Sequence, residues 1–226
     1  MELAYQIIYS KRKNLGITVE RDRSVVVRAP FGLPEEKIAL VVESKKRWLY
    51  EKINHIQKYT DKHDSSAKEL VSGESMPYLG RNYRLQVFTA DRESIEFKQK
   101  FIIHKAVSTN ADQLFKAWYK NKAKQKISPR VALCANSLGL EYSEVKIADM
   151  KYRWGSCTPQ NNIIFNWRII KSPIFVLEYL VVHELVHLIE SNHTPEFWNI
   201  LSIQIPSYEK AKKWLKENGY LLEIDF

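Results

Sequence analysis

The sequence predicts an α+β protein with a β-rich N-terminal half and a more helical C-terminal part. Up to about residue 104, short runs of β-branched and alternating residues predominate, interrupted by one amphipathic stretch. Beyond residue 110, apolar residues recur at helical spacing, with a few strands among them. We therefore expect a β-rich domain with one long helix over residues 1–108 and a second domain over residues 109–226.

The composition is typical of a soluble globular chain. Of its 226 residues, 45% are apolar and 27% are charged, which excludes a disordered or low-complexity polymer. The longest apolar run, residues 174–182, is shorter than the ~20 residues that cross a membrane, and residues 1–9 lack the pattern of a secretion signal. Two cysteines, Cys134 and Cys157, fit a reducing compartment. We expect a cytoplasmic protein with no membrane segment.

The chain is basic, with a formal net charge of +9. Such a charge is compatible with weak binding of nucleic acid or nucleotides, because a basic surface concentrates anions. The basic residues are nevertheless spread along the chain without a single block or a known nucleic-acid motif. A solvated basic surface is therefore the favoured interpretation.

The first elements are predicted as three strands followed by a helix. Residues 5–9, 15–20 and 24–28 carry β-branched or alternating residues. Apolar residues from Ile38 onward then recur at helical spacing, and this helix is expected to end near Ile56. A polar stretch, residues 57–75, is expected to form a loop.

A second set of short strands follows the loop. They are expected over residues 78–87, 95–97 and 101–104, with turns near Gly80 and Asp91. The N-terminal half of the chain is thus predicted to be mostly β.

The C-terminal part opens with a long helix over residues 111–138, in which Pro129 is a candidate kink. Three strands are expected after it, over residues 145–148, 152–156 and 163–169. No internal repeat is found along the chain.

The next helix has almost no polar face. Ser172 and Pro173 supply its start, as an N-cap oxygen and a residue whose missing N–H is not needed there. A helix that is apolar all round must lie inside a domain. Its apolar residues are Ile174, Phe175, Val176, Leu177, Leu180, Val181, Val182, Leu185, Val186, Leu188 and Ile189.

Three polar side chains interrupt this apolar helix in an HExxH pattern: His183, Glu184 and His187. Burying them costs several kcal/mol unless each finds a partner, and a bound cation suits all three. Residues four apart lie ~40° apart around a helix and ~6 Å along it, so two imidazoles can close on one zinc ion. Glu184, ~100° further round, is placed to act as general base on a water in the open position.

A catalytic zinc usually takes three protein ligands, and His193 is the predicted third. The helix must then stop after His187 and the chain must turn back, which Asn192 permits because asparagine tolerates the left-handed conformation. Thr194 and Pro195 are expected to cap a new helix. The alternative, buried histidines satisfied by backbone carbonyls, is disfavoured by the complete pattern.

Four strings of residues resemble one family. They read Arg153-Trp154-Gly155-Ser156-Cys157, Phe165-Asn166-Trp167, His183-Glu184-Leu185-Val186-His187 and Asn192-His193-Thr194-Pro195-Glu196-Phe197-Trp198. Together with an N-terminal segment ending near Trp48 and the Tyr78-Leu79-Gly80 element, they closely resemble the YgjP-like metallopeptidases, relatives of the SprT and WLM metalloproteases. The resemblance covers most of the chain.

This resemblance implies a zincin-like catalytic domain, here residues 109–226, whose buried active-site helix carries the first two histidines and whose third ligand is His193. It says little about substrates. The metzincin pattern has the same interval to its third histidine but a glycine midway; here that position is Glu190, which weakens a metzincin assignment.

Further residues are candidates for the site by type alone. An oxyanion partner is required, and Tyr208, Arg153 and His104 are eligible, although core packing is the favoured interpretation for Tyr208. Glu190 shares the face of the two helical histidines and is a candidate ligand or a carboxylate orienting an imidazole, with solvation at the helix end as an equal alternative. Glu209 is the fallback third ligand.

Residues 152–157 have two interpretations. They form either an edge strand that pairs with an extended substrate or an ordinary interior strand, with Trp154 and Trp167 in the core. Cys157 is a candidate neighbour of the metal, but a lone cysteine is more often a small buried apolar residue.

Three functions remain open at this stage. The leading hypothesis is a zinc metallopeptidase acting on flexible protein or peptide segments. The second is a metal-dependent nucleotide phosphohydrolase, and the third is a DNA-associated SprT-like protease that docks through residues 116–126. A purely structural metal would require a fourth protein ligand. Substrate preference and oligomeric state are not predicted.

Overall fold

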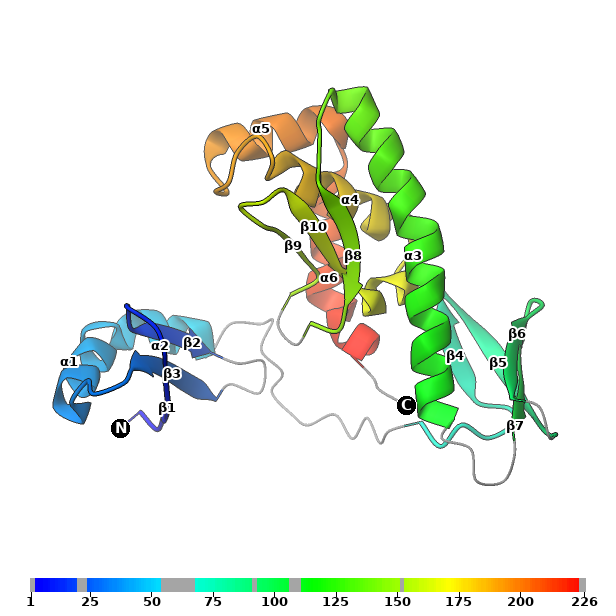
Figure 1. Cartoon of the computed structure of the whole chain (residues 1–226), viewed down its shortest axis with the longest axis horizontal. Helices are drawn as coiled ribbons and strands as arrows, with labels where there is room; N and C mark the ends of the chain where they lie inside the picture. The colour runs from blue at the N-terminus through cyan, green and yellow to red at the C-terminus, as the bar shows by residue number, and fades with distance from the viewer. Residues whose placement is uncertain are drawn as a thin grey trace. The chain divides into compact units, whose positions relative to one another are not determined.

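The structure is a computed structural model that describes residues 3–19, 24–53, 68–90, 93–105, 111–150 and 153–223. It is mixed α+β, with a β-rich N-terminal half and mainly helices in the C-terminal half, as predicted (Figure 1). The chain forms two compact units, Met1–Ser65 and Ser66–Phe226. No helix of the described residues is long and apolar enough to cross a membrane.

The first unit is a three-stranded sheet with two helices. Its strands are β1 (Gln6–Ser10), β2 (Gly16–Val19) and β3 (Val25–Pro30), in the order β1-β3-β2. β1 runs parallel to β3, and β2 runs antiparallel to it. The helices are α1 (Glu35–Ser44) and α2 (Lys46–Ile53). A small core joins sheet and helices through Val19, Val25, Val27, Ala29, Ile38, Val42 and Leu49.

The single long helix predicted here is wrong, because the helix is interrupted at Lys45. This residue has φ −103° and ψ 7°, outside the α-helical region. Leu49 can thereby join Ile38 and Val42 in the small core. The predicted end near Ile56 and most of the predicted loop lie outside the described residues.

The second unit opens with a four-stranded sheet made of β4 (Ser75–Tyr78), β5 (Arg81–Thr89), β6 (Ser94–Phe97) and β7 (Phe101–Lys105), in the order β4-β5-β7-β6. The predicted turn at Gly80 is confirmed, with a φ of +77°. A Cβ at this glycine would lie 2.7 Å from Pro173 Cα, so only glycine allows this close approach. The turn thereby places the sheet against Pro173, at the start of the helix Ile174–Val186.

The long helix α3 (Ala111–Leu138) has the predicted bounds and continues through Pro129. Figure 1 shows it passing along both sheets of the second unit, in agreement with its contacts to β6 and β8. Its buried residues recur every four positions, as one face of a helix against a core requires. The buried residues are Ala111, Phe115, Tyr119, Ala123, Ile127, Val131 and Ala135.

The division between the two units differs from the predicted boundary after residue 108. The Phe101 ring of β7 lies 5.8 Å from the ring of Phe115 and 4.8 Å from that of Trp118, both on α3. This shared aromatic core ties the sheet of β4 to β7 to the C-terminal helices. The sheet therefore belongs to the unit of residues 66–226 and not to an N-terminal domain.

A three-stranded sheet follows α3. It contains β8 (Glu144–Ala148), β9 (Gly155–Cys157) and β10 (Asn162–Asn166), in the order β8-β10-β9. β8 is parallel to β10, and β9 is antiparallel to it. Among the described residues β9 is thus an edge strand, while Trp167 is fully buried and Trp154 packs at the side of the core.

The prediction that the last strand extends to residue 169 is wrong. Residues Trp167–Lys171 form a 3₁₀ helix, η1, because the side chain of Asn166 accepts a hydrogen bond from the Arg168 N–H at 3.1 Å. A capping oxygen at this position starts a helical turn and ends the strand.

Three helices complete the unit: α4 (Ile174–Val186), α5 (Pro195–Gln204) and α6 (Tyr208–Glu223). α4 contacts α3, α5, α6 and β9, which confirms that the apolar helix lies inside the unit. The predicted N-cap at Ser172 is wrong. Its hydroxyl donates to the Ile169 carbonyl at 2.6 Å, and no side chain caps α4.

Candidate metal centre

Helix α4 ends at Val186, directly before His187, the second histidine of the HExxH pattern. Leu188 and Ile189 donate their N–H groups to the carbonyls of Leu185 and Val186, three residues earlier, at 3.0 and 2.9 Å. This tightening ends the helix, and His187 is its C-cap residue. The rings of His183 and His187 lie on the same face of the helix, 5.0 Å apart.

The chain then turns back through residues 188–193. Asn192 does not take the left-handed conformation that we predicted, since the described non-glycine residues with positive φ are Leu70, Leu79, Gln99 and Asn161. Instead, the carboxylate of Glu190 accepts a hydrogen bond from the Asn192 N–H at 3.0 Å. The predicted cap at Thr194 is present, because its hydroxyl accepts from the Phe197 N–H at 3.3 Å.

This turn brings the three predicted histidines together. His183, His187 and His193 each offer a ring nitrogen, and these atoms lie within 4.8 Å of one another. The Nε2 atoms of His183 and His193 are 3.0 Å apart. Ligand atoms around one tetrahedral zinc are about 3.3 Å apart, given zinc–nitrogen bonds of about 2.0 Å. The chemistry and spacing of the three donors therefore fit a single zinc ion.

Hydrogen-bond partners orient two of the three histidine rings. His183 Nδ1 shares a hydrogen bond with the Tyr179 hydroxyl at 3.3 Å, and His187 Nδ1 lies 3.1 Å from the Glu190 carbonyl oxygen. Such contacts leave the Nε2 atoms for a metal and fix the ring orientation. Glu190 thus orients His187 through its backbone, not through its carboxylate.

Two aromatic side chains of α5 complete this support, and our sequence reasoning did not single them out for it. The ring of Phe197 lies 4.9, 4.6 and 4.7 Å from those of His183, His187 and His193. Trp198 stacks on His193 at 5.5 Å with planes 23° apart. The helix cap at Thr194 was the available signal, because it directs the first turn of α5 back to the histidines.

The site favours neutral imidazoles. Burial first, and then the charges of His187, His193 and Lys212, lower the pKa of His183 to about 3. Burial and the charges of His187 and Lys212 also lower the pKa of His193. A neutral imidazole is the form that binds a metal, so these two rings are ready to act as ligands at neutral pH.

Glu184 is 4% exposed and faces strand β9. Burial raises the pKa of its carboxyl to about 8, against the opposing effects of the Arg153 charge and a hydrogen bond from the Cys157 backbone. A Cβ at Gly155 would lie 2.7 Å from Cγ and Cδ of Glu184. Only glycine therefore lets this strand approach the carboxylate so closely.

A pocket of about 580 Å³ opens beside the histidines. One wall is β9, with Gly155, Ser156 and Cys157, and Arg153 precedes it. Glu184, which packs against Gly155, and the three histidines also line this pocket. Of the two interpretations of residues 152–157, the edge strand agrees with the described β9, which lies beside the site. Cys157 lies at the pocket but outside the group of possible ligands.

Several residues proposed by type lie elsewhere. Tyr208 stacks on Trp198 at 5.5 Å, and Glu209 pairs with Lys212 at 2.9 Å. His104 stacks on Phe88 of the four-stranded sheet at 5.5 Å. None of Tyr208, Glu209 and His104 lines the pocket. Of the oxyanion candidates, only Arg153 does.

A buried carboxylate beside three convergent histidines, in a pocket bordered by an edge strand, defines a protein with a candidate mononuclear metal centre. A family model described as YgjP-like, metallopeptidase domain matches residues 13–218. The chain belongs to this family, which supports a metal-dependent hydrolase that acts on peptide bonds. No curated protein and no solved structure matches the chain.

Proposed function

We propose that the protein is a zinc metallopeptidase in which His183, His187 and His193 hold one zinc ion and Glu184 is the general base. The observation that carries this proposal is the pocket itself, which joins the three imidazoles, the buried carboxylate and an edge strand. This arrangement would make the second unit a zincin-like catalytic domain.

The donor set favours a catalytic ion over a structural one. Structural zinc sites are usually closed by four protein ligands, whereas catalytic sites keep a position open. In the part of the chain that the structure describes, the group that could share an ion here consists of the three histidines. A fourth position is then free to face the pocket.

When bound, zinc would polarise a peptide carbonyl and lower the pKa of water from 15.7 to about 7. Glu184 would accept a proton from the attacking water and deliver it to the leaving amine. Burial raises the pKa of Glu184 to about 8, and a nearby dication would lower it again. The hydrogen bond from the backbone of Cys157, on β9, would hold the Glu184 carboxylate in a fixed orientation.

The position of strand β9 favours a peptide as the substrate. Its pairing with β10 uses one edge, and its residues Gly155, Ser156 and Cys157 line the pocket. An extended peptide could add to such an edge through main-chain hydrogen bonds, which requires a flexible or unfolded segment. The guanidinium of Arg153 at the pocket is the candidate partner for the developing oxyanion.

The alternatives have less support. A nucleoside triphosphate needs several cations around its phosphates, but among the described residues that line the pocket Arg153 is the one lysine or arginine, and the neighbouring carboxylate of Glu184 would repel phosphate. No described feature favours recruitment to DNA over a solvated basic surface.

The decisive variant is Glu184→Gln, with Glu178→Gln as a matched control on the exposed face of the same helix. We expect one zinc per chain in the wild type and in both variants. Hydrolysis of casein and of quenched fluorescent peptides should fall by about 10²- to 10⁴-fold in Glu184→Gln only. Full activity of Glu184→Gln, or cleavage of nucleoside triphosphates but not of peptides by the wild type, would contradict the proposal.

A further inference from the structure

The chain crosses the end of strand β10 between β8 and β9. β8 pairs with one side of β10 up to the pair Ala148 and Asn166, and β9 pairs with the other side, beginning at Gly155 opposite Phe165. The described residues between the two strands, 149–150 and 153–154, lie at this end of β10, whose last residue is Asn166. We name these four residues the crossover.

Asn166 holds both ends of the crossover. Its side-chain amide donates to the Met150 carbonyl at 2.7 Å and to the Arg153 carbonyl at 3.2 Å. Its backbone N–H donates to the Trp154 carbonyl at 2.8 Å. Asn166 is only 2% exposed, so these bonds form away from water, where a lost partner is expensive.

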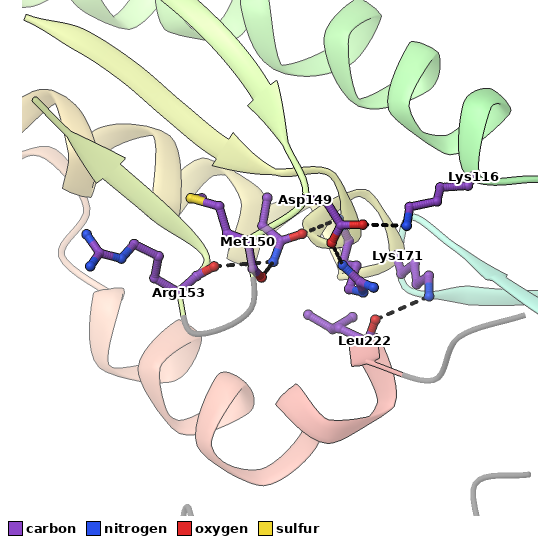
Figure 2. A network of polar contacts seen from close by, with 8 residues as sticks. Lys116, Asp149, Met150, Arg153, Lys171 and Leu222 are labelled. Carbon is purple, nitrogen blue, oxygen red and sulfur yellow. Dashed lines mark hydrogen bonds and ion pairs between the residues drawn. The ribbon is translucent and has the colours of Figure 1, made fainter. Parts of the chain in front are cut away.

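A second anchor fixes the beginning of the crossover. The carboxylate of Asp149 pairs with Lys116 of α3 at 2.5 Å and also with Arg168 of η1. Figure 2 shows the ion pair of Asp149 with Lys116 beside the hydrogen bonds to Met150 and Arg153. The first part of the crossover is thereby tied to α3 and to η1.

The far end of the crossover leads directly into the site. In Figure 2 the carbonyl of Arg153 points toward this network while its guanidinium extends away from it. That side chain lines the pocket, donates to the Ser156 hydroxyl at 3.1 Å, and its charge acts on the Glu184 carboxylate. Gly155, two residues on, packs against the same carboxylate.

We propose that Asn166 is a positioning residue for peptide hydrolysis, which acts through Arg153 and the main chain of β9. This inference rests on the proposed function. Asn166 is not among the residues that line the pocket, yet it fixes strand β9 and Arg153, the one lysine or arginine among the described residues of the pocket lining. Displacements of about 1 Å far from the reacting atoms can cost about 10²-fold in rate.

The side-chain chemistry explains why asparagine is needed here. Two carbonyl oxygens require two N–H donors, and the Arg168 N–H requires an acceptor. A side-chain amide supplies the two donors and the acceptor from a single short side chain. Aspartate keeps the acceptor for Arg168 but loses both donors and places a charge beside two carbonyl oxygens. Serine offers a single donor, so it can satisfy only one of them.

The test compares Asn166→Asp with Asn162→Asp, the same change at the other end of β10. In Asn166→Asp we expect kcat/KM for peptides to fall about 10- to 100-fold and bound zinc to stay at one per chain. Hydrogen exchange at the amides of residues 155–157 in the zinc-loaded protein should accelerate, while exchange in α3 stays unchanged. Asn162→Asp should resemble the wild type. Asn166→Ser serves if the aspartate variant does not fold.

A double-mutant cycle with Arg153→Ala separates positioning from general destabilisation. If Asn166 acts through Arg153, the loss in the double variant is smaller than the product of the single losses by about threefold or more. Multiplicative losses, uniform acceleration of exchange, or wild-type rates in Asn166→Asp would overturn the inference. If the wild type cleaves no peptide, the proposed function fails, while exchange at β9 still decides whether Asn166 holds the strand.

Discussion

The two sheets of the second unit contact the same helix, α3, but use it differently. The sheet of β4 to β7 meets it through aromatic rings, such as the pair Phe101 and Trp118 at 4.8 Å. The sheet of β8 to β10 continues into a polar network anchored on α3 by Lys116 and opens on the pocket. The comparison separates a sheet that stabilises the unit from a sheet that positions groups for chemistry.

The largest expected effect comes from a glycine in the sheet of β8 to β10, and it sharpens this comparison. In Gly155→Ala the new methyl would lie 2.7 Å from Cγ and Cδ of Glu184, so the strand or the carboxylate must move. We expect kcat/KM for peptides to fall by about 10²- to 10³-fold, with zinc still bound. Zinc analysis together with peptide hydrolysis checks this, and wild-type activity would show that the strand and Glu184 are not coupled.

The corresponding glycine in the sheet of β4 to β7, Gly80, should affect stability instead of activity. Gly80 has φ +77°, and a Cβ there would lie 2.7 Å from Pro173 Cα. Gly80→Ala should therefore lower the free energy of unfolding by about 2–3 kcal/mol, measured by urea denaturation. Activity per folded molecule should change little well below the melting temperature. A selective loss of activity at unchanged stability would contradict the distinction between a sheet that stabilises the unit and a sheet that positions groups for chemistry.

A third variant tests how the ring of Trp198 supports His193. Trp198 stacks on His193 at 5.5 Å, and its removal frees that ring. Trp198→Ala should weaken zinc binding by about 10-fold, measured by competition with a chelator. Trp198→Phe, which retains a flat ring, should recover most of the affinity. Equal affinity in the wild type and Trp198→Ala would remove the role of α5 in holding the third ligand.

The smallest effect concerns Asp149 and pH. Burial opposes its ionisation, but hydrogen bonds and charges from Lys116 and Arg168 prevail and lower its pKa from 3.8 to about 2. Because the folded pKa is depressed, the stabilisation is present above pH 3.8 and is lost as pH falls toward 2. Asp149 is partly exposed, so after solvent screening we expect about 1 kcal/mol or less.

This expectation is checked by urea denaturation of the wild type and Asp149→Asn between pH 6 and pH 2. The difference in unfolding free energy between the two should shrink as the pH is lowered through this range. A difference that stays constant, or grows toward low pH, would mean that the ionised carboxylate does not stabilise the start of the crossover.

Local patterns accounted for much of the fold. The bounds of α3 follow from apolar residues at helical spacing, and the fully apolar α4 is buried as its composition requires. The three histidines of the candidate site also follow from the sequence, because their spacing and burial limit the partners that could satisfy them.

The errors have a common physical origin in contacts between residues that local patterns do not specify. Asn166 ends β10 because it accepts from Arg168, and Ser172 bonds back to Ile169 instead of capping α4. The compact units divide the chain elsewhere than after residue 108, because aromatic rings of β7 pack on α3. Neither periodicity nor capping preference reveals such contacts.

The central claim is that one zinc ion is held by three imidazoles with a position left open. X-ray absorption at the zinc edge of the zinc-loaded protein measures this most directly, with His193→Ala as the control. The account predicts three imidazole nitrogens at about 2.0–2.1 Å and one further light atom, with one imidazole fewer in His193→Ala. A sulfur atom at about 2.3 Å, or an unchanged spectrum in His193→Ala, would contradict it.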